Sequence, residues 1–180
     1  MSTLNTEKAR QTILYICHKT ANNGSFGNVL LNKALYYADH ISYLKTGETI
    51  TGFSYVKQAQ GPTPAPYQYC PLRDQMLADC SIKEHQTERF GYIHKHMAAK
   101  IAPDMNVFSA AEISLIDEVI EELSCFSASE VSGRSHDLLA WQIADMMEDL
   151  PPFAYLLTQS DLTQDDLTWG EAVFEANKAA

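Results

Sequence analysis

The sequence predicts an α+β fold: a mainly helical single domain with a small antiparallel β-sheet or hairpin inserted in the middle. Apolar residues recur at helical spacing in the first fifty residues and again after Pro103. Between these two parts the spacing changes to the period of two that is typical of strands. The chain has 180 residues, 46% of them hydrophobic, which is enough for one sizeable core. We therefore expect one domain over residues 1–180, with its core over about 10–157.

Two helices are expected first. Asn5 or Thr6 can cap a helix that ends at Asn22-Asn23-Gly24. A longer helix is expected from about Asn28 to Thr46, followed by Gly47 as a typical residue just past a helix end. Its apolar stripe, which we interpret as core, consists of Leu30, Leu31, Ala34, Leu35, Ala38, Ile41 and Leu44.

The middle of the chain predicts strands. Residues Thr51–Gln60 alternate in the manner of a short strand, and the three prolines of Gly61–Pro66 are expected to end it, because proline has no N–H for a ladder. A brief helix over Pro71–Ala78 would carry Pro71 in its first turn. The segments Ser81–Arg89 and Phe90–Lys100 then predict the two strands of a hairpin.

The last part predicts helices again. Ser109-Ala110-Ala111-Glu112 and Ser127-Ala128-Ser129-Glu130 both match the capping box, and the second helix is expected to end at Gly133. A further helix is expected from Ser135-His136-Asp137 to about Glu148, before Pro151-Pro152. A C-terminal helix is expected over 164–175.

Charge is distributed unevenly along the chain. The net charge is −10, but residues 1–100 carry +4 and residues 101–180 carry −14. An acidic surface repels the nucleic-acid backbone and favours a basic protein partner, so nucleic acid is not the expected partner. The acidic residues that we expect to meet such a partner are Glu118, Glu121, Glu122 and Asp145.

Composition also predicts the compartment. No apolar stretch has the length of a signal-peptide core or a membrane span, so we expect neither membrane attachment nor export. The four cysteines are irregularly spaced, as in a chain with reduced thiols, and the predicted location is cytoplasmic. The glycine-rich phosphate loops, the nucleophile elbow and the H-E-x-x-H zinc motif are all missing from the sequence. We therefore expect neither a cofactor nor an enzyme.

Two histidine clusters keep an enzymatic alternative open. His94 and His96 could share one strand face, with His85 on the opposite strand, as ligands of a metal-assisted hydrolase. A half-exposed strand face, on which histidine is merely tolerated, accounts for them without a metal and is the favoured interpretation. His136 and Asp137 could act as a base and its orienting carboxylate. Adjacent helical residues point about 100° apart, however, and a capping role accounts for this second cluster.

Tyrosines surround the proline-rich segment. Tyrosines beside a rigid loop supply binding energy at small entropic cost, which favours a protein-binding surface, although a purely structural loop has the same composition. The residues that we expect to anchor a partner are Tyr37, Tyr55, Pro62, Pro64 and Tyr67.

Several short motifs occur in an order that resembles a known family. They are L-N-K-A-L-Y-Y-A-D at 31–39, T-G-E-T-I-T-G at 46–52 and G-P-T-P at 61–64, then S-A-S-E-V-S at 127–132 and S-H at 135–136 ahead of Trp141. Together they resemble the Panacea domain of SocA-like antitoxins over roughly residues 10–157. The motif residues are Lys33, Tyr36, Asp39, Gly52, Gly61, Ser135, His136 and Trp141.

The resemblance implies a role in a type II toxin–antitoxin system. Members of this family bind a toxin protein and block it, and some deliver the toxin to a protease. The implied partners are therefore a cognate toxin, encoded next to this chain, and in some cases a protease. No catalytic residue, metal or cofactor comes with the resemblance.

Overall fold

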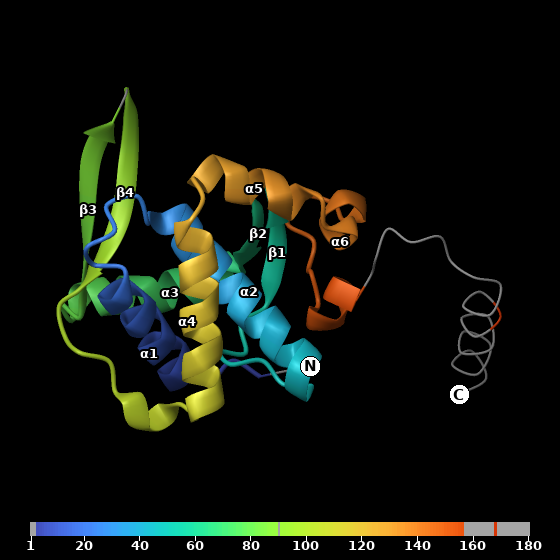
Figure 1. Ribbon diagram of the computed structural model, residues 1–180, viewed down its shortest axis with the longest axis horizontal. Helices are drawn as coiled ribbons and strands as arrows, with labels where there is room; N and C mark the ends of the chain where they lie inside the picture. The colour runs from blue at the N-terminus through green and yellow to red at the C-terminus, as the bar shows by residue number, and fades with distance from the viewer. Residues whose placement is uncertain (1–2, 90, 157–167, 169–180) are drawn as a thin grey trace.

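Helix α2 (Asn28–Thr46) lies at the centre of the structure, a computed structural model that describes residues 3–89, 91–156 and 168 (Figure 1). The elements that pack against it are the helices α1 (Thr6–Lys19), α4 (Ala110–Ser124) and α5 (Ala128–His136), the strand β2 (Gly61–Pro64) and the 3₁₀ turn η2 (Pro152–Leu156). The predicted α+β class is confirmed, because helices dominate and the strands form two small antiparallel pairs, β1–β2 and β3–β4.

The helices and strands follow one another in this order: α1 (Thr6–Lys19), α2 (Asn28–Thr46), β1 (Tyr55–Gln58), β2 (Gly61–Pro64), α3 (Pro66–Ala78), β3 (Ile82–Arg89), β4 (Tyr92–Ala99), the 3₁₀ turn η1 (Met105–Val107), α4 (Ala110–Ser124), α5 (Ala128–His136), α6 (Leu139–Ile143) and the 3₁₀ turn η2 (Pro152–Leu156). None of the helices in the described ranges is long and apolar enough to cross a membrane.

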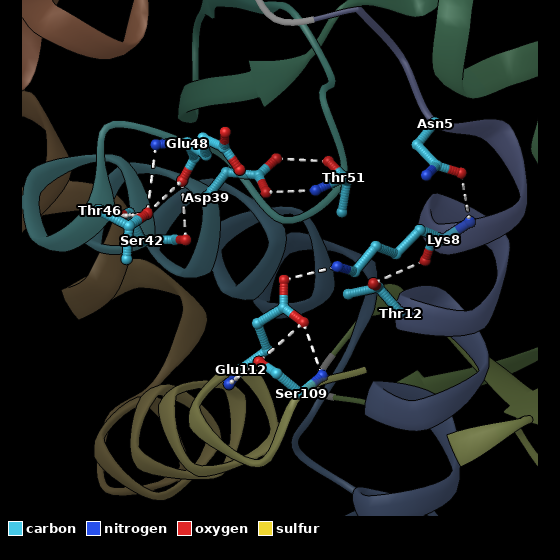
Figure 2. Close-up of polar contacts among 10 residues, drawn as sticks. All are labelled: Asn5, Lys8, Thr12, Asp39, Ser42, Thr46, Glu48, Thr51, Ser109 and Glu112. Carbon is cyan, nitrogen blue, oxygen red and sulfur yellow. Dashed lines mark hydrogen bonds and ion pairs between the residues drawn. The ribbon is translucent and has the colours of Figure 1, made fainter. Parts of the chain in front are cut away.

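Local signals fix the boundaries of the long helices. The Asn5 side chain accepts the Lys8 N–H at the start of α1 (Figure 2), and α2 ends at Gly47 with φ 80°, a left-handed conformation that glycine adopts without strain. Both predicted capping boxes are present, at Ser109 and Ser127. The predicted bounds of α2 are therefore confirmed, and so are the starts of α4 and α5.

The prediction that the prolines end the strand ladder is wrong. Gly61–Pro64 forms β2, with Pro62 opposite Lys57 of β1. The Lys57 backbone bonds instead to the segment on the other side of β1, where its N–H donates to the Glu148 carbonyl at 3.0 Å and its carbonyl accepts from the Met147 N–H at 2.9 Å. Pro62 therefore faces a position that needs no N–H from β2, so its missing donor costs nothing.

Three helix boundaries also differ from the prediction. Helix α3 begins at Pro66, so that Pro71 lies inside it and Pro66 takes the first-turn position. Helix α5 continues through Gly133 to His136, and the next helix, α6, covers only Leu139–Ile143. After α6 the chain instead bonds along the free edge of β1, which a helix to Glu148 would prevent.

The predicted hairpin is confirmed as β3 and β4, which extend beyond the helices (Figure 1). Apart from Thr168, the predicted helix over 164–175 lies outside the described residues.

Candidate functional site

Asp39, one of the motif residues, is a buried acceptor that joins α2 to the chain after it. Its carboxylate accepts the Thr51 N–H at 2.7 Å, the Thr51 hydroxyl and, at 2.7 Å, the Tyr55 hydroxyl; Figure 2 shows the two bonds to Thr51. Burial raises the pKa of Asp39 to about 6, although these hydrogen bonds oppose the shift. Tyr36, also buried, packs edge-on against Tyr55 with ring centroids 5.3 Å apart. These residues hold the core together and are not available to a partner.

Lys33 is buried under β2, where three motif residues meet. Its Nζ donates to the Pro62 carbonyl at 3.0 Å, and burial lowers its pKa to about 7. A Cβ at Gly61 would lie 2.2 Å from this Nζ and 2.1 Å from the Ser135 hydroxyl oxygen. Only glycine fits at this position, so Gly61 lets α2, β2 and α5 come together.

The remaining motif residues bring further segments into contact with this core. His136 and Trp141 join the α5–α6 segment to β1, and Gly52 lies against the N-terminal segment at Thr3. Trp141 stacks on His136 at 4.0 Å between ring centroids, and its indole N–H donates to the Gln58 carbonyl at 3.1 Å. The Lys57 Nζ lies 4.4 Å from the centroid of the Trp141 ring. Gly52, with φ 74°, has space for no Cβ because the Thr3 carbonyl oxygen would be 2.3 Å away. These contacts give the motif residues a structural role in joining the elements of the fold.

The expected partner-binding residues divide by exposure. Tyr55, Pro62 and Pro64 are buried, so no partner can reach their side chains in this structure. Tyr67 is 66% exposed, and Tyr37 is half-buried. The four acidic residues that were expected to meet a partner are all exposed: Glu118, Glu121, Glu122 and Asp145.

Helix α4 carries acidic residues on two faces with different surroundings. Toward α1, Glu112 pairs with Lys8 at 2.6 Å (Figure 2), and Asp117 pairs with Lys19 at 2.9 Å. On the other face, neither Glu118 nor Glu121 has a basic side chain within ion-pair distance among the residues that the structure describes. Lysines therefore neutralise Glu112 and Asp117, whereas on the side away from α1 Glu122 has Arg134 as a loose partner, at 3.9 Å, and that side keeps a net negative charge.

An apolar groove runs beside Glu118 and Glu122. Its volume is about 300 Å³, and α2, α4 and α5 enclose it. Its lining combines apolar side chains with three charged residues at the rim: Tyr37, Ile41, Leu115, Val119, Leu123, Phe126 and Val131, with Glu118, Glu122 and Arg134. Three of the expected partner-binding residues, Tyr37, Glu118 and Glu122, thus come together here from separate helices.

Other expected residues lie outside the groove. Glu121 is on α4 but does not line it, Tyr67 is on α3, and Asp145 follows α6. Ile41, Phe126 and Arg134 line the groove, and sequence reasoning missed all three as binding residues. Ile41 belongs to the apolar stripe of α2 and was assigned to the core, although it is only half-buried.

The histidines do not form a metal centre in the part of the chain that the structure covers. His85 and His96 are cross-strand partners whose rings stack at 5.1 Å, and the rings of His94 and His96 are 6.1 Å apart. Among the described residues no group of three or more His, Cys, Asp or Glu side chains is arranged to hold a metal ion.

Comparison with known proteins gives one match. A family model described as "Antitoxin SocA-like, Panacea domain" matches residues 31–142, which is more than half of the chain. No curated protein and no solved structure matches this chain. The matched range includes α2 from Leu31 onward, α4, both β-hairpins and every lining residue of the groove.

Proposed function

The chain belongs to the family of SocA-like antitoxins with a Panacea domain, and on this premise we propose that it neutralises a toxin protein by direct contact. The toxin docks on the face of α4 that carries Glu118, Glu121 and Glu122. One observation carries this assignment: Glu118 and Glu122 are exposed at the rim of an apolar groove, with Glu121 exposed next to them, while Glu112 and Asp117 of the same helix are paired with lysines.

The chemistry of this face is that of a protein interface. The apolar groove supplies the buried centre at which binding energy concentrates. The carboxylates around it attract a basic surface and speed the encounter, since complementary charge acts mainly on the association rate. The toxin is therefore expected to present basic residues around an apolar centre.

Co-expression tests the function itself. The product of the adjacent reading frame should stop growth when it is expressed alone, and expression of this chain should restore growth. If toxin abundance stays constant during rescue, the chain acts by occlusion; a fall in abundance would indicate delivery to a protease. If no adjacent product is toxic, the proposed function is wrong.

Charge reversal tests the docking face. Glu121→Lys with Glu122→Lys should lower the association rate with the toxin about tenfold at low salt and weaken its dependence on salt. The matched control reverses Asp74 and Glu88, on α3 and β3, and changes the net charge by the same amount. Biolayer interferometry over a range of NaCl concentrations measures both variants. Equal association rates for the two would place the docking face elsewhere.

A further inference from the structure

Arg134 occupies a distinctive position at the rim of the groove. Its guanidinium carbon lies 3.7 Å from the centroid of the Phe126 ring, and its Nη1 lies 3.9 Å from a Glu122 carboxylate oxygen. A cation at this place thus meets an aromatic face and a carboxylate at once. Both are groups that attract Lys and Arg side chains.

The resident cation is held weakly. The 3.9 Å separation from Glu122 is longer than a hydrogen bond, and the side chains of Arg134 and Glu122 are 58% and 70% exposed. An exposed ion pair and an exposed cation–π contact both contribute little, because water and salt screen the charges. Arg134 can therefore leave this position at small cost.

The groove beside Arg134 has room for side chains of a partner. An apolar cavity of roughly 150 Å³ holds one benzene molecule, so a volume of about 300 Å³ accommodates one or two bulky apolar groups. Glu118 lies at the same rim with no basic side chain within ion-pair distance among the described residues. The chemistry at the rim thus selects an apolar side chain flanked by positive charge.

We infer that the groove receives a bulky apolar side chain of the toxin, that a neighbouring Lys or Arg of the toxin takes the place over Phe126 and beside Glu122, and that Arg134 holds this place only in the free protein. This assignment rests on the proposed function and adds to it the chemistry of the toxin segment. A second copy of this chain fits less well, since a chain with net charge −10 repels itself.

Removing the resident cation tests the role of Arg134. Arg134→Gln should tighten binding of the toxin identified by co-expression about two- to fivefold, because the incoming cation no longer competes. Arg73→Gln on α3 removes the same charge at a distance from the groove and should leave the dissociation rate unchanged. Weaker binding by Arg134→Gln would show that Arg134 itself contacts the toxin and would overturn the inference.

Neighbouring carboxylates on α4 give a second matched pair. Glu122→Gln should raise the dissociation rate about tenfold, because the toxin cation loses its carboxylate, whereas Glu121→Gln should alter only the association rate. Ile41→Glu should abolish binding, and Ile41→Leu should retain it. Melting temperatures close to that of the wild type establish that each variant is folded. Equal dissociation rates for Glu121→Gln and Glu122→Gln would overturn the inference while leaving the toxin-neutralising function intact.

A probe that does not depend on the toxin separates the two proposals. Random peptides displayed on phage and selected on the full-length chain should be enriched in a bulky apolar residue next to Lys or Arg, and Ile41→Glu should no longer bind them. Selection of acidic peptides, or of none, contradicts the inference. Sedimentation of the wild-type chain as a dimer that Ile41→Glu dissociates would identify a second copy as the occupant and would also overturn it.

Discussion

Lys33 has a buried amine under the β1–β2 hairpin. It is 1% exposed, and its Nζ donates to the Pro62 carbonyl in a space that Gly61 leaves open. A charged amine in such a space loses most of its hydration, which is why burial lowers its pKa to about 7 from 10.5. The charged form of Lys33 therefore destabilises the folded chain.

This cost predicts how stability depends on pH. Between the folded pKa of about 7 and the ordinary value of 10.5, the unfolded chain binds more protons than the folded chain, so stability rises with pH in this window. From pH 7 to pH 8.5 the free energy of unfolding should increase by roughly 2 kcal/mol. Lys33→Met should remove most of this increase, and Lys83→Met, at an exposed position of β3, should keep it. Urea unfolding at the two pH values measures the slopes; equal slopes for Lys33→Met and the wild type would contradict the account.

At the scale of single elements, the sequence predicted the helix boundaries that depend on neighbouring residues alone. The bounds of α2 follow from its apolar spacing and Gly47, and the starts of α4 and α5 follow from their capping boxes. The proline strand β2 could not be predicted in this way. It tolerates Pro62 because the segment around Glu148, about ninety residues after Lys57, takes up the hydrogen bonds of Lys57 on the other edge of β1.

The candidate site likewise contains residues that the sequence predicted and residues that only the tertiary structure identifies. The charge count along the sequence identified Glu118 and Glu122, because charge is a property of each residue. The groove exists only where α2, α4 and α5 meet, so the roles of Ile41, Phe126 and Arg134 depend on tertiary packing. Packing also buried Tyr55, whose hydroxyl bonds to Asp39 in the core.

Two glycines test how tightly these elements are joined. Gly61 and Gly47 both have positive φ, at 95° and 80°, so alanine strains the backbone at each. A methyl group at Gly61 also collides with Lys33 and Ser135, whereas the space around Gly47 is open. Gly47→Ala should cost about 1–2 kcal/mol of unfolding free energy, and Gly61→Ala about 1–3 kcal/mol more. Chemical denaturation gives both values, and similar losses would show that the junction of α2, β2 and α5 is loosely packed.

At the scale of the whole molecule, the charge separation is only partly neutralised within the fold. Lys8 and Lys19 of the first half pair with Glu112 and Asp117 of α4, which accounts for the face toward α1. The net charge of −10 remains, and the whole negative excess comes from residues 101–180, which carry −14 against +4 in residues 1–100. Like charges at helical neighbours such as Glu118 and Glu122 repel each other and destabilise the free protein.

The same charges should therefore act in opposite directions on stability and on binding. Raising NaCl from about 10 to 200 mM shortens the screening length from about 30 Å to less than 10 Å. The melting temperature of the free chain should rise, because salt reduces the destabilising self-repulsion by more than it reduces the stabilisation from the few surface ion pairs. The association rate with a basic toxin should fall.

The variant with Lys at 121 and 122, whose net charge is −6, should show a smaller rise in melting temperature. The control variant, in which Asp74 and Glu88 are reversed, has the same net charge, but its substitutions lie outside the acidic residues 101–180. The melting temperature of this control should therefore rise with salt more than that of the variant with Lys at 121 and 122. Differential scanning calorimetry across the salt series measures this effect. A melting temperature that falls with salt would mean that pairs such as Lys8–Glu112 outweigh the repulsion. The acidic residues of α4 beside the groove would then not destabilise the free protein.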